Sequence, residues 1–372
     1  MIRLMHCISD TNFGGAGRVL LNYLNHFDVE HFDVIVVIPK GSKLLNYLAQ
    51  DKYRVVEVDG LYDRSYSKKD VGCLIKIIKE YQPDIVHSHG ALSARIAAKK
   101  CGKKVVYTRH SVFDLPKWQT SWWGKLALGT MNHRYADRII AVSPAAKDLL
   151  VASGTDAESV EVIFNGVEEL KRADESACKE AREKYGVSSS DFVCTIMARL
   201  EEVKGHDYII EAAQILKSQG VTDLKILVAG TGGIEQRLKE SAASRNVDDI
   251  VRFIGFVNDI PTLLSITDVQ LNASYGTEAT SMALLEGFSL SVPAVVSDFG
   301  GNPYVVINED NGLIFPQKDS NALANAILKI KEDGNLYKKT SAGARAMFDM
   351  KFTAEKMTKN MQNIYYQLQG VK

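Results

Sequence analysis

Two cations, Arg199 and Lys204, lie in a short segment that follows a predicted strand over 192–197. Lys204 is followed by Gly205 at the predicted start of a helix, which would hold the lysine near one place. A departing diphosphate needs fixed positive charge of this kind, because negative charge develops on the leaving group. A solvated basic loop is the alternative interpretation of the same residues.

Two carboxylates, Glu278 and Glu286, follow a later predicted strand over 269–271. We expect both on one face of a helix that starts near Glu278, because their spacing is just over two helical turns. Glu278 can reach sugar hydroxyls, and the neighbouring free amides would point towards an anion. Those amides belong to Ala279, Thr280 and Ser281. Two glutamates at this spacing also occur by chance, although the apolar run 282–285 argues against a solvated face.

A glycine-rich turn with Gly14, Gly15 and Arg18 follows the first predicted strand and opens a helix. Glycine lets the backbone come close to an anion, and a helix N-terminus adds partial positive charge. The turn does not fit the dinucleotide pattern GxGxxG, because Leu20 stands where the third glycine is required. A nicotinamide-dependent dehydrogenase is therefore disfavoured, whereas an ordinary tight turn stays an alternative.

Three histidines, His87, His89 and His110, stand at the ends of predicted strands. They could suggest a metal site, but neither a DxD motif nor a ligand-like spacing of His and carboxylates accompanies them. We therefore expect no metal, and we expect His87 to be structural.

The elements that must position these residues alternate between short apolar strands and helices along the whole chain. Near-continuous apolar strands separated by helices are typical of parallel sheets covered on both faces. The pattern runs to about residue 163 and starts again at 192, which predicts two Rossmann-like domains. We expect an N-terminal domain over 1–166, a C-terminal domain over 167–350 and a last helix over 351–372 that packs back on the first domain.

Composition agrees with two domains, because 372 residues exceed the roughly 250–300 that one core supports. Five scattered cysteines without CxxC spacing indicate reduced thiols, and no apolar run approaches the ~20 residues of a membrane span, so we expect a cytoplasmic protein. Net charge is zero, but residues 1–166 have 22 Lys and Arg against 17 Asp and Glu. The basic half hints at an anionic partner, or it reflects solvated faces that happen to differ. We expect no nucleic-acid partner.

All three tryptophans, Trp118, Trp122 and Trp123, lie between Lys117 and Lys125. Such a segment suits contact with an anionic membrane surface or with a lipid-linked acceptor. The alternative is an ordinary loop and helix whose aromatic side chains pack into the domain.

Taken in order, these motifs resemble family-4 retaining glycosyltransferases of the GT-B fold. The resemblance covers nearly the whole chain, and its strongest part runs from Arg199 to Asn302. The ordered set is far more specific than any single motif. Its motifs are Gly14-Gly15 with Arg18, His110, Arg199…Lys204-Gly205, Gly230-Thr-Gly232, Glu278-x7-Glu286 and Val292–Asp298.

The resemblance implies that Arg199 and Lys204 bind the diphosphate of a nucleotide-sugar donor, with Glu278 on the transferred sugar and Glu286 on the ribose. His110 resembles the family histidine near the sugar C6 hydroxyl. The remaining donor-binding residues that it implies are Gly14, Gly15, Gly230, Gly232, Phe256, Val257, Ala279, Thr280 and Ser281. Arg18, His89 and Trp118 are candidates for the acceptor side.

The implied reaction is transfer with retention and without a metal or other cofactor, from a UDP-linked hexose or N-acetylhexosamine to a sugar or lipid-linked acceptor. By family analogy, the product would belong to bacterial surface polysaccharide or glycolipid. The family often has Glu-Gly-Phe-Gly where this chain has Glu278-Ala-Thr-Ser281, which leaves the choice of hexose open. A sugar-nucleotide epimerase of the same fold and a non-catalytic binding protein are the alternatives.

Overall fold

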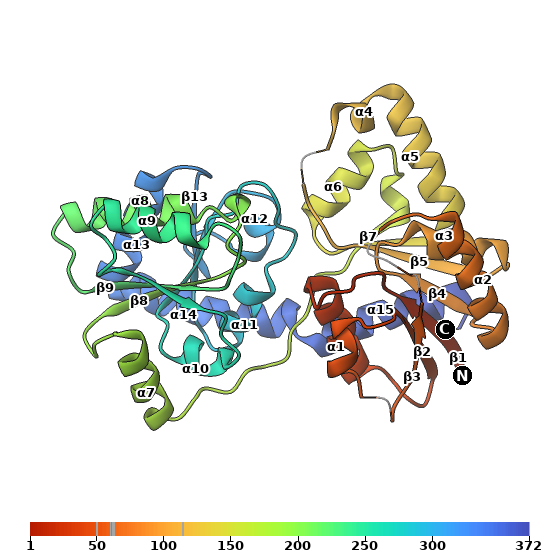
Figure 1. The fold of residues 1–372 in the computed structure, drawn as a ribbon, viewed down its shortest axis with the longest axis horizontal. Helices are drawn as coiled ribbons and strands as arrows, with labels where there is room; N and C mark the ends of the chain where they lie inside the picture. Colours follow the sequence, from red (N-terminus) through yellow and green to blue (C-terminus); the bar gives the residue numbers. More distant parts are fainter. Residues whose placement is uncertain (50, 60, 62–63, 114, 372) are drawn as a thin grey trace. The chain divides into compact units, whose positions relative to one another are not determined.

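The computed structural model describes residues 1–49, 51–59, 61, 64–113 and 115–371. The chain forms two compact units. Unit 1 contains Met1–Val167 and Ala354–Lys372, and unit 2 contains Glu168–Thr353. The domain limits expected from the sequence were 1–166, 167–350 and 351–372. Each unit is an α/β body with one parallel sheet, as the sequence predicts (Figure 1).

Unit 1 is built on a seven-stranded sheet in the order β3-β2-β1-β4-β5-β6-β7. All of its neighbouring strands run parallel. The strands are β1 (Ile2–Cys7), β2 (Phe32–Pro39), β3 (Arg54–Val58), β4 (Ile85–Ser88), β5 (Lys104–Arg109), β6 (Arg138–Ala141) and β7 (Val160–Val162). The helices are α1 (Gly15–His26), α2 (Lys68–Tyr81), α3 (Leu92–Lys100), α4 (Lys117–Thr120), α5 (Trp122–Tyr135), α6 (Pro144–Ala152) and α15 (Ala354–Gln369).

Unit 2 is built on a six-stranded sheet in the order β10-β9-β8-β11-β12-β13, again parallel throughout. Its strands are β8 (Phe192–Met197), β9 (Leu224–Ala229), β10 (Val251–Gly255), β11 (Val269–Asn272), β12 (Ala294–Ser297) and β13 (Gly312–Phe315). Its helices are α7 (Glu175–Tyr185), α8 (His206–Ser218), α9 (Glu235–Ser244), α10 (Ile260–Ser265), α11 (Met282–Ser289), α12 (Asn302–Val305), α13 (Ser320–Glu332) and α14 (Gly334–Met347). A short 3-10 helix, η3 (Glu202–Lys204), precedes α8, and a π-helical turn, η4 (Phe348–Phe352), follows α14.

Local sequence signals set where several helices begin and end. Helix α7 starts after Asp174, whose side chain accepts a hydrogen bond from the Ala177 amide, and it ends at Gly186 with φ +67°. Helix α13 starts after Asp319 in the same way. Helix α6 combines a Ser143 cap with Pro144 at its first position. These caps satisfy terminal amides that would otherwise lose their hydrogen bonds on folding.

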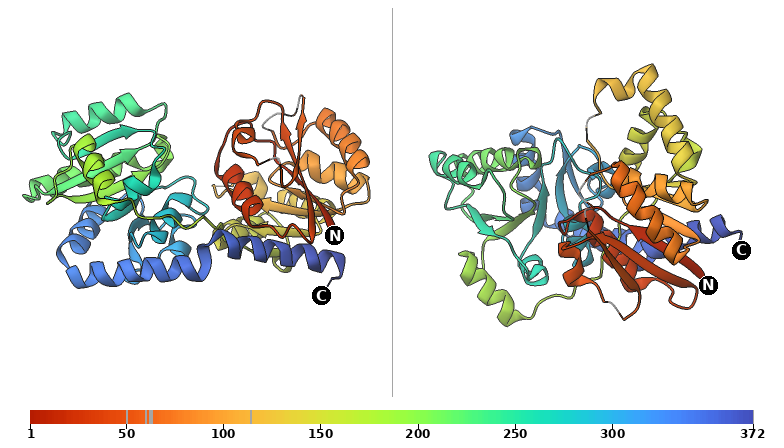
Figure 2. Two further views of the ribbon diagram at one scale, coloured as in Figure 1. Left: turned by 90° about the horizontal axis from the view of Figure 1, so that it is seen from below. Right: turned by 45° about the vertical axis from the view of Figure 1, so that its right-hand side comes forward.

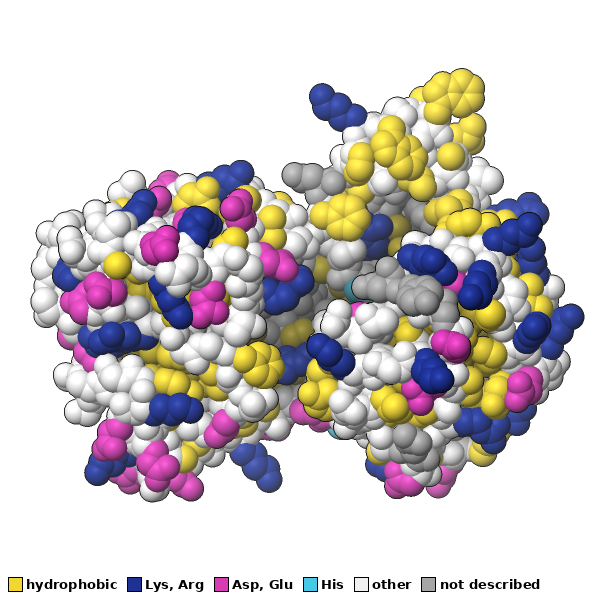
Figure 3. Space-filling view, in the orientation of Figure 1, with side chains coloured by type: hydrophobic (Ala, Val, Ile, Leu, Met, Phe, Trp, Pro, Cys, Tyr) yellow, Lys and Arg dark blue, Asp and Glu magenta, His cyan; other side chains and the backbone are white. Residues whose placement is uncertain are grey.

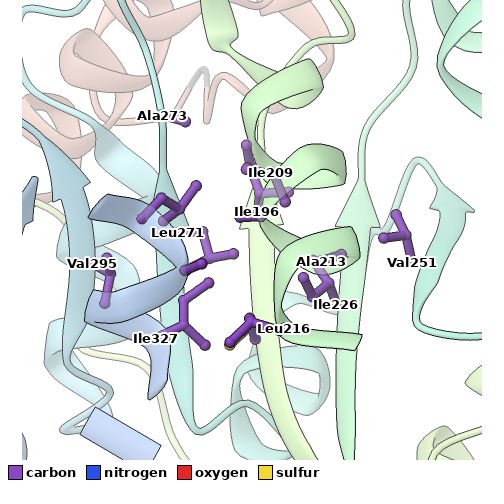
Figure 4. Packing of buried hydrophobic residues seen from close by; sticks show 14 of the residues in the cluster. Ile196, Ile209, Ala213, Leu216, Ile226, Val251, Leu271, Ala273, Val295 and Ile327 are labelled. Atoms are coloured by element: carbon purple, nitrogen blue, oxygen red, sulfur yellow. The ribbon is translucent and has the colours of Figure 1, made fainter. Parts of the chain in front are cut away.

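The core of unit 2 lies between its sheet and its helices. Ile196 and Leu271 from the sheet pack against Leu216 of α8 and Ile327 of α13, and all four are at most 3% exposed (Figure 4). Unit 1 has its own core on one face of its sheet, formed by strand and helix residues such as Met5, Val86 and Leu74. Two separate cores explain why the chain divides, because each sheet buries its own apolar faces.

Helix α15 closes unit 1, where it packs against α1 and lies along the unit (Figure 2). The spacing of Met357, Met361, Ile364 and Leu368 in the sequence predicts one apolar face for this helix. The first three residues are buried, whereas Leu368 is only partly buried. Tyr365 is fully buried beside them. Among the described residues, no helix is long and apolar enough to cross a membrane.

Candidate active site

The candidate site of unit 2 lies where the strand order of its sheet reverses, between β8 and β11. In an open parallel sheet this is the place where loops from neighbouring strands separate and leave room for a ligand. Arg199 and Lys204 follow β8, and Glu278 follows β11. The topology therefore brings the predicted cations and one predicted carboxylate to the same edge of one sheet.

Lys204 and Glu278 form an ion pair at this edge. The Lys204 Nζ atom lies 3.1 Å from Glu278 Oε2 and donates a second hydrogen bond of 2.9 Å to the Thr277 carbonyl oxygen. The side chains are only 15% and 11% exposed. Partial burial weakens screening by water, so both charges act on their surroundings more strongly than surface charges do.

Two polar side chains that the sequence did not single out also hold Glu278. Asn272 donates to Oε2 at 3.1 Å and Ser274 donates to the same oxygen at 3.3 Å. Asn302 donates in turn to Asn272 Oδ1 at 3.4 Å. The signal in the sequence was a run of polar residues at the end of a buried strand, Asn272-Ala-Ser274. These donors fix the position of the carboxylate.

Glycine allows the Lys204 loop to lie directly on the end of β11. Gly205 has φ +73°, and a Cβ atom at this residue would lie 2.0 Å from the Ala273 carbonyl oxygen. The Tyr275 amide donates to the Val203 carbonyl oxygen at 2.9 Å, which ties the two loops together. No larger residue fits at position 205 without moving one loop, so Gly205 is required to place Lys204.

Arg199 differs from Lys204 in its surroundings. Its side chain is 72% exposed and pairs with Glu201 at 2.8 Å. Gly230 and Gly232, two predicted donor-binding residues, pack against the backbone on either side of Arg199. Cβ atoms there would come within 2.0 Å of the Ala198 carbonyl oxygen and 2.2 Å of the Leu200 carbonyl oxygen, so both glycines support the backbone around Arg199.

The prediction that Glu278 and Glu286 share one helical face is wrong. Helix α11 begins at Met282 with Ser281 as its N-cap, so Glu278 lies in the loop before the helix and only Glu286 belongs to it. Ala279 and Thr280 are buried in that loop instead of standing in the first helical turn. The loop is shaped by Gly301, whose amide donates to the Glu278 carbonyl oxygen at 2.9 Å. This contact between distant segments is not visible in the local sequence.

Phe256 and Val257 follow β10 at the same edge of the sheet. Phe256 is largely exposed, whereas Val257 packs into an apolar cluster that includes Leu263. The Gly230 amide donates to the Gly255 carbonyl oxygen at 2.8 Å, which places this segment beside the Gly230 turn. An exposed ring next to a strand end offers a flat apolar surface on which a ligand ring can stack.

In unit 1, Gly14 is the N-cap of α1 and Gly15 is its first residue. No side chain caps this end, and the first turn has no acidic residue. A Cβ atom on Gly15 would meet nothing within 4 Å, so the space at its Cβ position is open. Arg18 is in the same first turn, where its amide bonds the Gly14 carbonyl oxygen at 3.0 Å. An uncapped helix N-terminus of this kind suits an anion.

The predicted histidines of unit 1 belong to a larger set that includes His6 of β1, a residue that no sequence motif singled out. His89 bonds both His6 and His110, at 3.0 and 2.9 Å. His87 bonds the Tyr365 hydroxyl at 2.6 Å and the Thr108 hydroxyl at 2.7 Å. Its role is structural, as expected, because both of its ring nitrogens contact other parts of the fold.

Burial keeps these histidines neutral. Desolvation is the main cause that lowers the pKa of His6, His87 and His89 well below the usual value, and neighbouring histidines lower it further. Desolvation by burial also lowers the pKa of His110, to about 4. His6, His87 and His89 each have a possible ligand atom within 4.8 Å of the others, the closest approach to a metal site among the described residues. Five of their six ring nitrogens already form hydrogen bonds, the exception being His6 Nε2, so the set is described as a hydrogen-bonded network.

The tryptophan segment lies on the surface of unit 1. Trp118, Trp122 and Trp123 are 57%, 65% and 71% exposed, and Leu126 is exposed beside them. Figure 3 shows hydrophobic side chains gathered over α4 and α5. The alternative in which these aromatic side chains pack into the domain is therefore wrong.

Comparison with known proteins agrees with this architecture. Residues 13–169 match the family described as Glycosyltransferase Family 4, and residues 178–347 match the one described as Glycosyl transferases group 1. The chain is 28% identical over 347 residues to the Escherichia coli UDP-Gal:alpha-D-GlcNAc-diphosphoundecaprenol alpha-1,3-galactosyltransferase, which covers 89% of this chain and 88% of that protein.

Two solved structures show the same fold over the whole chain. The Anabaena protein HepE in complex with UDP has a TM-score of 0.84 at 21% identity, covering 99% of this chain and 100% of HepE. A glycosyltransferase from Rickettsia africae has a TM-score of 0.82 at 22% identity, with 99% and 98% covered. Both family matches and the two parallel-sheet domains lead to one conclusion: the chain belongs to the family-4 glycosyltransferases and has the GT-B fold.

Proposed function

We propose that this glycosyltransferase moves a hexose or N-acetylhexosamine, with retention of configuration, from a UDP-linked donor to a sugar or lipid-linked acceptor. The observation that carries the proposal is the half-buried pair of Lys204 and Glu278 at the strand-order reversal of unit 2. A cation and a carboxylate side by side suit a ligand with a charged diphosphate next to a sugar bearing hydroxyls.

In the proposed reaction, the bond between the anomeric carbon and the diphosphate oxygen breaks, and a bond from the acceptor oxygen to that carbon forms on the same face. The proton of the acceptor hydroxyl passes to the departing phosphate oxygen. Lys204 and Arg199 stabilise the charge on the diphosphate, with help from the amides of Gly14 and Gly15, so the reaction needs no metal.

The remaining residues bind the donor in this proposal. Glu278 and His110 hold hydroxyls of the transferred sugar, Glu286 holds the ribose, and Phe256 stacks on the base. Glu278 suits its role because Asn272 and Ser274 fix it through Oε2. A carboxylate held in this way binds hydroxyls without the entropy loss of ordering a mobile side chain.

The donor proposal is tested by thermal-shift titration in EDTA with UDP, GDP, ADP and several UDP-sugars, on the wild type and Lys204→Ala. A ligand at 100 times its dissociation constant stabilises the protein by about 2.7 kcal/mol. We expect UDP and its sugars to raise the unfolding temperature of the wild type and to lose that effect in Lys204→Ala. Lys217→Ala is the matched control, because Lys217 is exposed and pairs with Asp249 far from this loop.

Absence of any nucleotide effect would overturn the proposal and favour a binding protein for another ligand. Release of an epimerised sugar nucleotide without an acceptor would instead identify an epimerase. Both outcomes are read from the same protein, the first by the shift in unfolding temperature and the second by chromatography of the nucleotide products.

For the acceptor, we propose a lipid-linked sugar at the cytoplasmic face of a bacterial membrane, within synthesis of surface polysaccharide or glycolipid. The name of the Escherichia coli relative specifies a sugar on diphosphoundecaprenol as its acceptor. The surface of α4 and α5 supports the same partner, because its exposed tryptophans are flanked by Lys117 and Lys125. Tryptophan favours the headgroup level of a bilayer, and lysine is attracted to anionic lipids.

A further inference from the structure

Three imidazoles of unit 1 are bonded end to end. His6 Nδ1 lies 3.0 Å from His89 Nε2, and His89 Nδ1 lies 2.9 Å from His110 Nε2. Successive rings are stacked, with interplanar angles of 26° and 22°. The residues come from β1 and from the loops after β4 and β5, which are adjacent strands of one sheet. We call this set the histidine chain.

The bonding of the histidine chain restricts where its protons lie. Each neutral imidazole has one N–H and one lone pair. Two consecutive bonds can then form in only two ways. In the first, all three rings carry the proton on Nδ1, so His6 donates to His89 and His89 donates to His110. In the second, all three rings carry the proton on Nε2, so His110 donates to His89 and His89 donates to His6.

Each arrangement leaves an N–H at one end of the chain. The two terminal atoms, His6 Nε2 and His110 Nδ1, are both buried and have no hydrogen-bond partner among the described residues. His6 is fully enclosed, whereas His110 is partly exposed at the end of its strand. A buried N–H without a partner is unfavourable. At the His110 end a ligand can supply the partner, because His110 is partly exposed, whereas no ligand can reach the enclosed His6.

We propose that His89 and His6 are positioning residues that hold His110 in the tautomer with its proton on Nδ1, aimed at an oxygen atom of the substrate. The bond from His89 occupies Nε2 of His110 as an acceptor and so leaves Nδ1 as the donor. Stacking of His87 on His89, with ring centroids 4.5 Å apart, keeps the middle ring in register. Identification of the oxygen as a donor-sugar hydroxyl rests on the proposed function; the tautomer does not.

The tautomer is tested directly by nitrogen NMR of the full-length protein labelled with ¹⁵N-histidine, without substrate. We expect the His110 signals of a neutral ring protonated on Nδ1, assigned by their loss in His110→Ala. In His89→Leu, which removes the bond to Nε2, the His110 signals should move towards an exchanging mixture of tautomers. A wild-type His110 protonated on Nε2 would overturn the proposal, whatever the protein does as an enzyme.

A kinetic cycle tests whether His89 acts through His110. His89→Leu should raise KM for the donor about 5- to 50-fold, the size of one lost hydrogen bond to a substrate. The same change in a His110→Ala background should have little further effect, because coupled residues are not additive. His89→Asn, whose amide can still donate to His110 Nε2, should restore most of the loss.

Equal effects of His89→Leu in both backgrounds would show that His89 only supports the fold and would overturn the positioning role. Urea unfolding of each variant identifies any general loss of stability. If the NMR result holds but the wild type transfers no sugar, the tautomer assignment stands and the proposed function fails. The two failures are therefore distinguishable.

Discussion

At the scale of single residues, the charge on Glu278 is the first feature to test. Its carboxylate pairs with Lys204 and accepts from Asn272 and Ser274, so Glu278→Gln keeps the size and much of the hydrogen bonding while it removes the charge. We expect kcat/KM to fall on the order of 10²-fold, comparable to the loss of one preorganised group in an active site. Steady-state kinetics with a UDP-sugar measures this.

Glu235→Gln is the control for that prediction, because Glu235 also pairs with a lysine, Lys239, but on the exposed surface of α9. It should leave kcat/KM unchanged. If both variants behave alike, the half-buried pair has no special role in the reaction.

The second residue-scale prediction concerns pH and follows from the buried histidines. The pKa of His110 and of His206 is lowered to about 4 by burial, whereas an unfolded histidine titrates near 6.5. As the pH falls below about 6.5, the unfolded state binds protons that the folded state does not. The free energy of unfolding should therefore decrease, by up to about 1.4 kcal/mol per pH unit for each such histidine.

This dependence is measured by urea unfolding between pH 7.5 and 5.0. His206→Asn should reduce the slope against pH, whereas His133→Asn, at an exposed histidine of α5, should not. An identical slope in His206→Asn and the wild type would contradict the assignment of a neutral buried His206.

At the scale of elements, the join between the loop after β8 and the end of β11 depends on Gly205. A Cβ atom there would meet the Ala273 carbonyl oxygen at 2.0 Å, so Gly205→Ala should displace the loop that carries Lys204. We expect loss of nucleotide binding together with a lower free energy of unfolding. Binding is measured by calorimetry and stability by urea unfolding.

Gly220→Ala is the matched comparison, since Gly220 has φ +85° but nothing lies within 4 Å of its Cβ position. It should cost about 1 kcal/mol through backbone strain alone and leave binding intact. Equal losses of binding in the two variants would show that the effect is strain and not the close approach of the two loops.

The surface over α4 and α5 gives a second element-scale prediction. Residues 115–136 contain no Asp or Glu, and the three tryptophans are exposed. Binding to phosphatidylglycerol vesicles should fall at least 10-fold in the double variant Lys117→Glu with Lys125→Glu, because each lysine near an anionic surface contributes about 1 kcal/mol. The same fall is expected in Trp122→Ser with Trp123→Ser, because tryptophan favours the membrane interface. Vesicle co-sedimentation measures this.

Lys68→Glu with Lys69→Glu makes the same change of charge at exposed positions of α2 and serves as the control. It should leave vesicle binding nearly unchanged. Equal weakening by both charge reversals would indicate attraction to the whole basic half of the chain, and no weakening by the tryptophan changes would remove α4 and α5 as the membrane-binding surface.

At the scale of the whole molecule, the chain leaves unit 1 at Val167 and contributes α15 to it after completing unit 2. The Ala354 amide bonds the Val167 carbonyl oxygen at 2.9 Å, so the last helix starts beside the point where the chain leaves the unit. Removal of residues 354–372 takes away Met357, Met361 and Tyr365 from the interior of unit 1.

We expect this truncation to destabilise unit 1 selectively, because unit 2 has a separate core. Hydrogen–deuterium exchange should show lost protection in β1 and β4, while β8 and β9 retain theirs. Tyr365→Phe, which removes only the hydroxyl bonded to His87, should give a smaller effect confined to unit 1. Equal loss of protection in both sheets would mean that the two units unfold as one.

Much of the fold follows from the sequence, because a strand buried on both faces must be apolar along its length and its connecting helix must have one apolar stripe. That requirement located the two series of strands and the face of the last helix with Met357, Met361 and Ile364. It also predicted Lys204 and Glu278 as site residues, since polar side chains that follow buried strands stand out locally. The order of motifs was sufficient to indicate the family.

Which side chains meet was decided only by the tertiary structure. Strand order is not contained in local patterns, and it is strand order that joins Lys204 to Glu278 across β8 and β11 and leaves Arg199 with Glu201. In the sequence, His6 is one more residue of a buried strand. The adjacent positions of β1, β4 and β5 in the sheet bring it into line with His89 and His110. The exposure of the three tryptophans likewise depends on what packs around α4 and α5. The sequence of a short helix with apolar residues does not show whether those residues face the core or the solvent.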